Sequence, residues 1–528
     1  IRLQPNHARG HSNLGALLVN QRRFQEAISS LEDALRLDSG QTEAARYLGL
    51  AYSELGQSTL ALRWFERALE LNPSLISVLN DLSGELCFQG RVDEAIRSYR
   101  ELLVKSPDAD VAAHNLLLTL NYDHSLDPHS VFQEHVQWGR RLMQRIGSQP
   151  LHTNVRNPNR RLRIGYVSPD FLAHSVAFFI EPVLANHNHD RVEIYCYAAS
   201  ARVDAMTEWL RSLATHWRSI HDMDDTHVVE LIRNDQIDIL VDLAGHTDGT
   251  RLEVFAHQPA PVQVTYLGYP NTTGLPTMHY RLTDAIADPD SFDHLYTETL
   301  VRLPRSFLCY MQSEHAPAVQ PLPSLRAGHV TFGSFNNLAK IRAETVALWA
   351  QILKTTTGSR LLLKSSILGD DNGVRTRYLE MFFHHGIEPD RLELLGRIPG
   401  RAAHLDVYNR VDIALDTFPY NGTTTTCEAL WMGVPVVTLE GNHHAGRVGV
   451  SLLTQVGLTD LIAKTQEDYV NIAVRLASEL PKLASLRADL RQQMAASPLC
   501  DAQTFTRNLE AAYREMWRGW CEKQHPNT

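Results

Sequence analysis

The stretch LGLAYSELGQSTLALRWFERALELNP, residues 48–73, decides the fold of the N-terminal part of the chain, because its key positions recur every 34 residues. A small alanine at position 61 lets two helices approach closely, and large side chains such as Leu14 and Phe65 fill the layers between helices. The proline at position 73 ends the second helix of the unit. The period therefore predicts helix pairs that cannot bury their apolar faces alone and must stack. The recurring positions are Leu14, Leu48 and Leu82, then Ala27, Ala61 and Ala95, then Gly56 and Gly90, and then Pro5, Ser39, Pro73 and Pro107.

The middle unit resembles a tetratricopeptide repeat. We expect an all-α array over residues 1–122, with a degenerate fourth unit that starts near Val111 and is interrupted between Asp123 and Pro128. A helical connector is expected over residues 123–160. The alternative is a generic helical bundle, which several positions repeating in register disfavour. Such arrays usually hold peptides or partner proteins on a concave surface. The signature positions are Leu48, Gly49, Tyr52, Ala61, Phe65, Ala68 and Pro73.

The composition is that of a globular protein that does not bind nucleic acid. Of its 528 residues, 44% are hydrophobic and 21% charged, the formal net charge is -10 and the pI is about 6.2. Nucleic-acid-binding domains normally carry a basic face. The six cysteines form no C-x-x-C pair, which argues against a disulfide framework or a zinc site and fits a reducing compartment. No apolar run long enough for a membrane helix occurs, so the expected location is cytoplasmic. Because residue 1 is an isoleucine within a repeat, we expect the chain to be a truncation.

From Arg163 onwards, short apolar runs alternate with longer amphipathic ones, which predicts two Rossmann-like α/β domains with parallel sheets. Two such domains form a cleft, and ligands of open α/β sheets bind at the carboxyl ends of the strands. The absence of G-x-G-x-x-G and P-loop motifs disfavours dinucleotide oxidoreductases and P-loop enzymes. The expected parts are a first domain over 161–311, a linker over 312–328, a second domain over 329–480, and C-terminal helices over 481–528, the last of which crosses back to the first domain. The expected strands are 162–167, 193–197, 237–242, 262–267 and 281–286, then 330–335, 361–364, 392–395, 413–416 and 434–439.

The stretch DTFPYNGTTTT, residues 416–426, places a strand end, a turn and four threonines directly before an expected helix over 427–433. The unpaired backbone N–H groups and the positive dipole end of such a helix form an anion site. Thr424 and Thr425 can add hydroxyl donors to a diphosphate. Glu428, expected in the first helical turn, can accept hydrogen bonds from ribose hydroxyls. The alternative is plain N-capping, because a threonine before a helix with an acid in its first turn is a common helix start.

Lys340 ends the stretch FNNLAK, residues 335–340, which follows the first strand of the same domain. Loops at the carboxyl ends of parallel strands meet at one edge of the sheet, so we expect Lys340 to reach the same diphosphate. The alternative is a solvated surface lysine. Two polar loops at one sheet edge favour the phosphate role.

Four separated motifs, together with the repeats, resemble the O-linked N-acetylglucosamine transferase family over essentially the whole chain. They are RIGYVSPDF at 163–171, LGYP at 267–270, FNNLAK at 335–340 and the threonine stretch at 416–426. The resemblance implies the GT-B fold, UDP-GlcNAc as donor, inversion at the anomeric carbon, and neither a metal ion nor another cofactor. It also implies that the acceptor is a Ser or Thr hydroxyl of a protein or peptide, which the repeats would hold.

The resemblance further assigns residues to the sugar-nucleotide site. Lys340 is implied to hold the β-phosphate, and Asn337 to lie beside the donor. Thr424 and Thr425 match the phosphate-binding threonines of the family. Arg401 and His404 are implied to flank the uridine, the backbone of Ile398 and Pro399 to recognise the base, and Leu267 to belong to the UDP-sugar site.

Three positions depart from the family pattern. Thr423 takes the place of a family histidine near the sugar, so that contact is weakened or changed. Glu428 replaces an aspartate that binds the ribose. Ala339 stands where animal members have a tyrosine, which removes any hydroxyl contribution there.

His174 follows Asp170 by four residues near the end of the first strand, and by resemblance both face the acceptor side. An ordinary histidine titrates near pH ~6.5, which suits a general base. The alternative is a hydrogen-bond donor that positions the donor sugar and the acceptor. Asp170 is expected to orient the imidazole or to shuttle the proton.

Other polar motifs are interpreted as structural. They include His246-Thr247 and His443-His444, and also Asp288-x-Asp290, which superficially resembles a metal motif of the other transferase fold. Acceptor-binding members of the family carry an asparagine ladder inside the repeats, and here Asn13 and Asn115 match it, whereas Tyr47 and Asp81 do not.

Two other functions remain open. One is another GT-B enzyme, such as a sugar-nucleotide epimerase or a transferase to asparagine or to a small molecule. The other is a repeat scaffold with an idle transferase domain. The repeats favour a protein acceptor, because an epimerase needs no peptide-binding superhelix.

Overall fold

The computed structural model describes residues 5–147, 151–312, 315–369 and 372–522. Residues 1–4, 148–150, 313–314, 370–371 and 523–528, which belong to several predicted domains, lie outside the described residues. Of the helices in the described part of the chain, none combines the length and the apolar character needed to cross a bilayer.

The chain forms two compact units. The first contains residues 1–123, 322–418 and 470–483, and the second contains residues 124–321, 419–469 and 484–528. Each unit combines segments of several predicted domains, so the predicted domain bounds remain a prediction.

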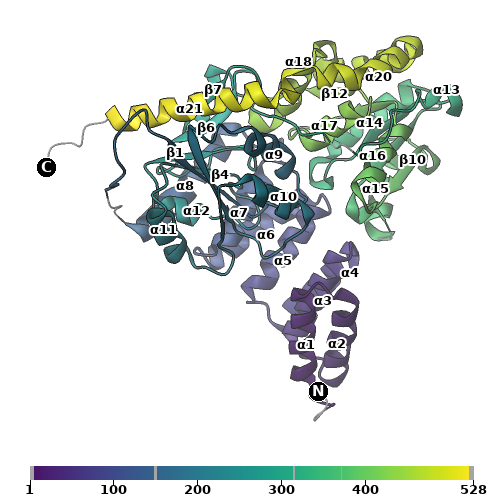
Figure 1. The fold of residues 1–528 in the computed structure, drawn as a ribbon. Coiled ribbons are helices and arrows are strands. Elements are labelled where there is room, and N and C mark those ends of the chain that lie inside the picture. The colour runs from purple at the N-terminus through teal and green to yellow at the C-terminus, as the bar shows by residue number, and fades with distance from the viewer. Residues whose placement is uncertain (1–4, 148–150, 313–314, 370–371, 523–528) are drawn as a thin grey trace. The chain divides into compact units, whose positions relative to one another are not determined.

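Seven helices at the purple end of the colour scale in Figure 1 form the repeat array of the first unit. Within each pair a small residue lets the helices touch, since a Cβ added to Gly49 would lie 2.5 Å from the Phe65 ring. Leu48 and Phe65 are buried, as predicted. The prediction that Leu14 fills a layer between helices is wrong, because this residue is 37% exposed. It lies on α1, which packs against α2 and α3 on one side. The helices are α1 (Ala8–Asn20), α2 (Phe24–Leu37), α3 (Thr42–Glu54), α4 (Ser58–Leu71), α5 (Ile76–Phe88), α6 (Val92–Lys105) and α7 (Asp110–Leu120).

A parallel sheet in the first unit has the strand order β10-β9-β8-β11. Ile413 of β11 lies opposite Phe332 of β8, so the carboxyl ends of these two strands meet, as predicted. Buried Asp412 fixes the opposite end, because its carboxylate accepts hydrogen bonds from the N–H groups of Ser324 and Thr331 at 2.9 and 2.8 Å. The elements are β8 (Thr331–Ser334), β9 (Arg360–Lys364), β10 (Leu392–Leu395), β11 (Ile413–Leu415), α13 (Ser324–Ala327), α14 (Ala343–Thr355), α15 (Asn372–His384) and α16 (Arg401–Asp406).

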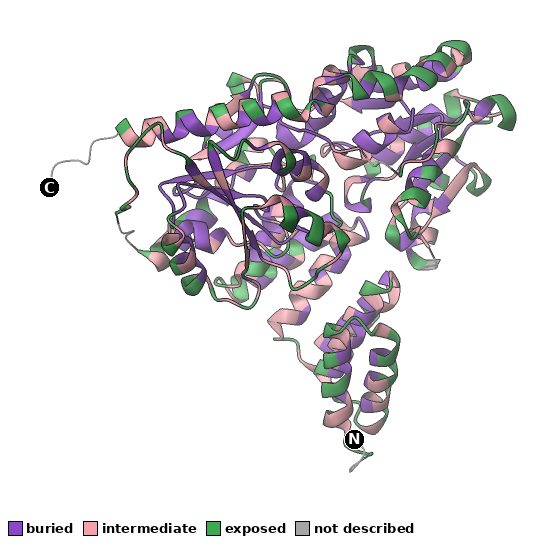
Figure 2. Ribbon diagram, viewed as in Figure 1, coloured by how far each residue is buried: buried purple, intermediate pink, exposed green. Residues whose placement is uncertain are grey.

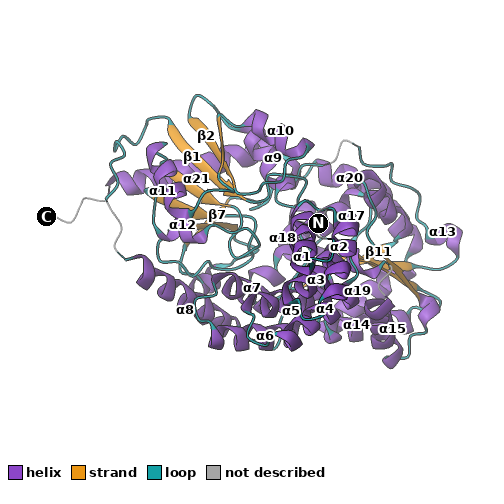
Figure 3. Ribbon diagram, turned by 90° about the horizontal axis from the view of Figure 1, so that it is seen from below, coloured by secondary structure: helices purple, strands orange, loops and turns teal. Residues whose placement is uncertain are grey.

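The second unit contains a seven-stranded parallel sheet in the order β3-β2-β1-β4-β5-β6-β7. Figure 3 draws its strands in orange, and Figure 2 shows its central strands buried, as expected for a parallel sheet. The edge strands β3 (His216–Ser219) and β7 (Thr299–Leu303) were not predicted, because each is short, partly exposed and interrupted by an arginine. The other elements are β1 (Leu162–Ser168), β2 (Val192–Ala198), β4 (Ile239–Asp242), β5 (Val262–Thr265), β6 (Tyr280–Asp284), α8 (Pro128–Ile146), α9 (Ala177–Asn186), α10 (Ala205–Leu213), α11 (Asp225–Asn234) and α12 (Leu252–Ala256).

The segment 419–469 is fastened to this sheet by buried polar contacts. Ser451 donates a hydrogen bond to the Asp284 carboxylate at 2.6 Å, and the Arg447 guanidinium donates to the Ile286 carbonyl at 2.9 Å. Its strands β12 and β13 pair in parallel, and β13 was not predicted because it has only two residues. The elements are α17 (Thr424–Trp431), β12 (Val436–Leu439), α18 (Val448–Val456) and β13 (Ile462–Ala463).

The helical tail crosses back to the first Rossmann-like sheet, as predicted. Its last helix, α21 (Ala502–Glu522), packs against α9, β5 and β7. Glu510 accepts a hydrogen bond from the His187 ring at 2.9 Å, and the Trp517 indole donates to the Asn157 carbonyl at 3.0 Å. The preceding helices are α19 (Gln466–Ser478) and α20 (Leu480–Ala495).

Candidate active site

The loop after β8 carries Asn337 and Lys340, as the sequence predicted. A single 3-10 turn, η2 (Leu338–Lys340), begins after Asn337, whose side-chain oxygen accepts a hydrogen bond from the Ala339 N–H at 3.0 Å. Asn337 is exposed and Lys340 is half-buried. The turn therefore fixes the backbone that presents a lysine at the carboxyl end of the sheet.

Burial lowers the pKa of Lys340 to about 8, and Asp416 acts in the opposite direction. Asp416 directly follows the neighbouring strand β11, is 2% exposed, and accepts a hydrogen bond from the Thr417 N–H at 2.9 Å. A lysine that is costly to charge in a half-buried place is stabilised by a bound anion. Asp416 has no predicted role, although the adjacency of strands β8 and β11 is the signal that would have paired it with Lys340.

The residues expected around the uridine lie between β10 and the end of α16. Ile398 is half-buried and Pro399 is exposed, and Arg401 and His404 belong to α16. The His404 ring centroid lies 6.1 Å from that of Phe335, which immediately precedes the Asn336-Asn337 pair. The structure thus brings the predicted base-recognition and phosphate residues of this unit to neighbouring loops.

An aromatic pair at this place was missed by sequence reasoning. The rings of Phe335 and Tyr408 lie 4.2 Å apart, and the Lys364 ammonium lies 5.8 Å from the Phe335 ring. The two aromatic residues are far apart in the sequence, and no spacing pattern connects them. Their apolar faces form part of the surroundings of His404.

The threonine run differs from the prediction in one respect. Helix α17 begins at Thr424, so Thr424 and Thr425 lie in its first turn with their backbone N–H groups at the helix start. Thr423 is the N-cap residue, but its side chain makes no capping hydrogen bond, which contradicts the N-capping alternative. The placement of Glu428 in the first turn is wrong. Because the helix starts three residues earlier than expected, Glu428 is its fifth residue and is only 5% exposed.

Asp170 and His174 lie together after β1, as expected. The distance from the His174 Nδ1 atom to the nearer Asp170 carboxylate oxygen is 3.4 Å, and the imidazole is 47% exposed. The Val176 N–H also points to Nδ1, at 3.4 Å. The two contacts require opposite tautomers, because the Val176 N–H needs an unprotonated Nδ1 whereas the Asp170 carboxylate accepts from a protonated one. Nε2 can accept a proton only in the tautomer that Asp170 favours.

Two further charged residues act on this pair. Burial raises the pKa of Asp170, His174 lowers it, Asp248 raises it and Arg202 lowers it. Asp204 anchors the loop, because its carboxylate accepts hydrogen bonds from the N–H groups of Ala173 and Thr207. Asp248 and Arg202 were not predicted to act here, because the sequence around them carries no recognisable motif.

Leu267, expected in the sugar-nucleotide site, has a strained backbone. Its φ is +67°, and the left-handed region costs a non-glycine residue about 1 to 2 kcal/mol. A Cβ added to Gly268 would lie 2.1 Å from the Leu243 carbonyl oxygen, so packing against the end of β4 holds this turn. Strained backbone of this kind concentrates at functional sites.

The polar motifs interpreted as structural have structural contacts. The His246 ring is buried and lies 2.8 Å from the Thr273 carbonyl oxygen. The His444 ring lies 2.6 Å from the Asp288 carboxylate, and Tyr296 donates to the same carboxylate at 2.7 Å. Burial raises the pKa of Asp288, but the charge and hydrogen bond of His444 outweigh this effect and lower it well below its ordinary value.

The carboxylates of Asp288 and Asp290 lie in different surroundings and do not form a common metal site. Its side chain is 93% exposed and pairs with Arg302, whereas Asp288 is buried. In the part of the chain that the structure describes, no three His, Cys, Asp or Glu side chains are grouped to hold a metal ion. Metal independence itself remains a prediction.

The ladder positions of the repeats carry two kinds of contact. The Asn115 amide donates to the Asn80 side-chain oxygen at 3.1 Å between α7 and α5. Asp81 accepts a hydrogen bond from Arg46 at 2.7 Å between α5 and α3. An ion pair thus stands where the resemblance would place a neutral amide.

Family models match most of the chain. One described as glycosyl transferase family 41 matches residues 113–320 and 322–509, and a tetratricopeptide repeat model matches residues 12–76. A solved structure of a Thermobaculum terrenum O-GlcNAc transferase mutant is 39% identical, has a TM-score of 0.93 and covers 98% of each chain. This similarity confirms the predicted GT-B class preceded by a tetratricopeptide array.

Curated relatives are similar over a shorter share of their own length. A Petunia hybrida protein named probable UDP-N-acetylglucosamine–peptide N-acetylglucosaminyltransferase SPINDLY is 47% identical, over 80% of this chain and 46% of its own. An Arabidopsis thaliana protein named probable UDP-N-acetylglucosamine–peptide N-acetylglucosaminyltransferase SEC is 36% identical, over 70% of this chain and 38% of its own. The chain therefore spans about half the length, or less, of the curated relatives it matches.

Proposed function

Because the chain belongs to glycosyl transferase family 41, we propose that it is an inverting, metal-independent transferase that moves N-acetylglucosamine from UDP-GlcNAc to Ser and Thr hydroxyls of proteins. The observation that carries this proposal is the turn after β8, where Lys340 lies half-buried beside Asp416 at the carboxyl end of the sheet. This is the place where open α/β sheets bind their ligands, and an ammonium there suits a phosphate. The names of the SPINDLY and SEC relatives support the choice of donor and acceptor.

In the proposed reaction, the acceptor oxygen attacks the anomeric carbon as the bond from that carbon to the β-phosphate oxygen breaks. UDP leaves with the electron pair, and attack from the opposite face inverts the anomeric carbon. Lys340 stabilises the negative charge that grows on the β-phosphate. The first turn of α17, with Thr424 and Thr425, supplies further donors to the diphosphate, so that no metal ion is required.

His174 accepts the proton of the acceptor hydroxyl in this proposal. Asp170 lies 3.4 Å from Nδ1 and stabilises the protonated ring, which leaves Nε2 as the basic atom. The alternative is that His174 only positions the donor sugar and the acceptor. The two roles differ in their pH dependence, because only a base must be unprotonated to act.

The remaining residues are proposed to bind parts of the donor. Phe335 beside His404 supports base recognition at this place, and the strained backbone of Leu267 supports a binding role for the loop after β5. The proposed contacts are Asn337 beside the donor, Arg401, His404, Ile398 and Pro399 at the uridine, Glu428 at the ribose, Thr423 near the sugar, and Leu267 elsewhere in the UDP-sugar site.

The tetratricopeptide array is proposed to hold a protein or peptide acceptor. The Asn115–Asn80 contact supports an amide surface at one ladder position. The Arg46–Asp81 ion pair makes the surface that would face the acceptor more charged than an uninterrupted asparagine ladder. A cytoplasmic location is proposed because all six cysteines are free thiols, which suits a reducing compartment.

A second candidate is transfer of another sugar from a different nucleotide. The departure at Thr423, which replaces a family histidine near the sugar, favours it, and Glu428 replaces an aspartate at the ribose. A glutamate carries its carboxylate one methylene further than an aspartate, and a threonine lacks the imidazole donor. The Thr423 change alters the part of the site next to the transferred sugar, whereas the Glu428 change alters a contact with the ribose that UDP and GDP donors share.

Incubation with radiolabelled UDP-GlcNAc, UDP-glucose and GDP-sugars in a cell lysate separates the functions. The proposal expects labelled protein from UDP-GlcNAc, with slower transfer from the other donors. Labelled protein from a GDP-sugar alone would establish the second candidate. Consumption of UDP-GlcNAc without labelled protein would favour an epimerase or a small-molecule transferase, and no consumption of any donor would favour an idle scaffold.

A further inference from the structure

One turn of the repeat array lies directly against the turn that carries Lys340. Gly90 links α5 to α6 with a φ of +77°, and a Cβ added there would lie 2.8 Å from the Leu338 carbonyl oxygen. Leu338 is the first residue of η2, two residues before Lys340. The Tyr378 hydroxyl donates to the same carbonyl at 3.2 Å. The backbone of the Lys340 turn is therefore in close contact with both the array and helix α15.

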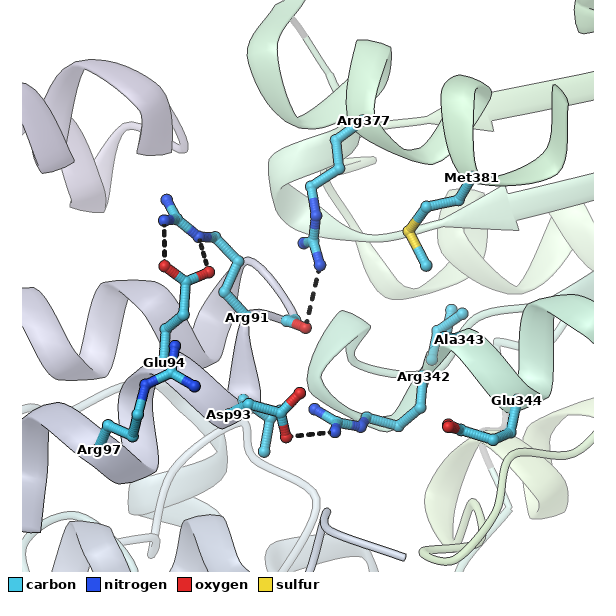
Figure 4. Close-up of a pocket in the computed structure, with 12 residues that line it drawn as sticks. Arg91, Asp93, Glu94, Arg97, Arg342, Ala343, Glu344, Arg377 and Met381 are labelled. Carbon is cyan, nitrogen blue, oxygen red and sulfur yellow. Dashed lines mark hydrogen bonds and ion pairs between the residues drawn. The ribbon is translucent and has the colours of Figure 1, made fainter. Parts of the chain in front are cut away.

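Two arginines of the sugar-nucleotide part reach across to the same turn of the array. The Arg342 guanidinium, only 8% exposed, lies 2.6 Å from the Asp93 carboxylate in the first turn of α6. The Arg377 guanidinium donates to the Gln89 carbonyl at 2.6 Å and to the Gly90 carbonyl at 3.3 Å. Figure 4 shows both arginines directed at this turn from the other side of a pocket.

A pocket borders these contacts, so removal of the Asp93 side chain should leave no closed cavity in a packed core. It has a volume of about 330 Å³ and separates the first turn of α6 from the residues that follow Lys340. Asp93 is 62% exposed at its edge. Its neighbour Glu94 is half-exposed and pairs with Arg91 of its own turn at 2.6 Å. The hydrogen bond from Arg91 and, to a lesser degree, the Arg377 charge lower the pKa of Glu94, but it makes no ion pair with Arg342.

We propose that the Gly90 turn and the Arg342–Asp93 ion pair position Lys340, so that the tetratricopeptide array is part of the donor site and not only a holder of acceptors. Arg342, Asp93 and Gly90 are positioning residues, because they act through the backbone of η2 and touch no substrate. The significance of this role rests on the proposed function, since Lys340 needs a fixed place only if it binds a phosphate.

The expected effect is larger on catalysis than on folding. Asp93 is mostly exposed, so water can take the place of its carboxylate, and loss of this pair should cost less stability than loss of a fully buried one. A displacement of a catalytic group by roughly 1 Å can lower a rate by about 100-fold. Loss of the pair should therefore lower kcat about 10- to 100-fold while the protein stays folded, with a smaller change in KM for the donor.

The first test compares Asp93→Ala with Glu94→Ala. Both remove one acid from the first turn of α6, but only Asp93 reaches Arg342. The pH dependence of Lys340 acetylation by trace acetic anhydride, followed by mass spectrometry, reports how the lysine is held without any substrate. Asp416 is the charged group that acts on this lysine in the described residues, and neither variant changes it.

In the wild type and in Glu94→Ala, the midpoint of Lys340 acetylation is expected near pH 8. In Asp93→Ala it should rise towards the ordinary lysine value of about 10.5 as water reaches the loosened turn. The conservative Arg342→Lys, which keeps a cation opposite Asp93, should preserve most of the wild-type behaviour. Equal midpoints and equal kcat values in Asp93→Ala and Glu94→Ala would overturn the proposal.

A second pair tests the glycine contact. Gly90→Ala and Gly56→Ala place an alanine at equivalent turns with φ of +77° and +74°, so the backbone strain is matched. At Gly56 the new Cβ would meet the Ser366 carbonyl oxygen at 3.2 Å, away from the Lys340 turn. Gly90→Ala should change Lys340 acetylation and kcat, and Gly56→Ala should not. If both glycine variants behave alike, Gly90 has no positioning role.

The outcomes separate this inference from the proposed function. A wild type that binds no UDP and transfers no sugar would refute the proposed function, while the acetylation comparison would still decide whether the array holds Lys340. A wild type that transfers N-acetylglucosamine, with Asp93→Ala indistinguishable from Glu94→Ala, would refute only the inference.

Discussion

UDP should bind about 10-fold more weakly at pH 9 than at pH 7, because Lys340 loses its charge within this interval. In the free protein, burial lowers the pKa of Lys340 to about 8. A pKa of 8 leaves about nine-tenths of the lysines charged at pH 7 and about one-tenth at pH 9. A bound β-phosphate favours the charged form and raises the pKa, so binding at pH 9 must take up a proton.

The size of the effect follows from these fractions. If the bound lysine stays charged up to about pH 10, the dissociation constant rises about 10-fold from pH 7 to pH 9, which corresponds to about 1.4 kcal/mol. Calorimetric titration with UDP in two buffers of different ionisation enthalpy counts the protons. We expect uptake of about 0.1 proton at pH 7 and about 0.9 at pH 9.

Lys340→Arg is the matched control, because an arginine keeps its charge throughout this range. Any titration of UDP itself appears equally in both proteins, so the difference between them isolates Lys340. The arginine variant should bind UDP with an affinity that changes little between pH 7 and pH 9. The charge of Lys340 would not control UDP binding if the affinity of the wild type were unchanged over this range, or if it fell equally in Lys340→Arg.

Further predictions concern UDP binding without a metal ion, the role of His174 as a base, and the buried Asp288–His444 pair. UDP should raise Tm equally in EDTA and in Mg²⁺, by an amount equivalent to about 2.7 kcal/mol at roughly 100 times its Kd, and loss of the shift in EDTA would contradict the metal-free site. His174→Ala should slow transfer about 100-fold with UDP affinity nearly unchanged and the acidic limb of the rate profile removed, whereas a smaller loss with that limb retained would assign His174 to positioning. Asp288→Ala should lower the free energy of unfolding by about 3 to 5 kcal/mol, because it leaves the buried His444 without its partner, and urea denaturation measures this. Since the pKa of Asp288 is lowered in the folded state, its contribution is present above pH ~4 and is lost as the pH falls, and a wild type with unchanged stability down to pH 3 would contradict this pairing.

Periodic features of the sequence predicted most of the fold. The 34-residue step located the helix pairs, because small and large residues must meet for a pair to close, as Gly49 and Phe65 do between α3 and α4. Buried strands such as β4 were found because parallel strands are apolar on both faces. The edge strands β3 and β7 are partly exposed and interrupted by an arginine, and their pairing depends on neighbours that are distant in sequence.

The candidate site was predicted where chemistry and local sequence coincide. Lys340 and the threonine run stand at strand ends, and helix dipoles make such places recognisable. Glu428 was misplaced because helix starts are uncertain by a few residues when several threonines precede them. The Arg342–Asp93 pair joins residues 249 positions apart, and no local pattern can reveal a contact of that kind.

Mass spectrometry of acceptor proteins, with fragmentation that retains the sugar, shows whether the chain transfers N-acetylglucosamine to Ser and Thr side chains. Lysate proteins would be incubated with UDP-GlcNAc and either the wild type or Lys340→Met. We expect N-acetylhexosamine on Ser and Thr side chains with the wild type, and a level reduced at least about 100-fold with the variant. Modification of asparagine, no modification at all, or transfer that requires a GDP-sugar in place of UDP-GlcNAc would contradict the proposed function.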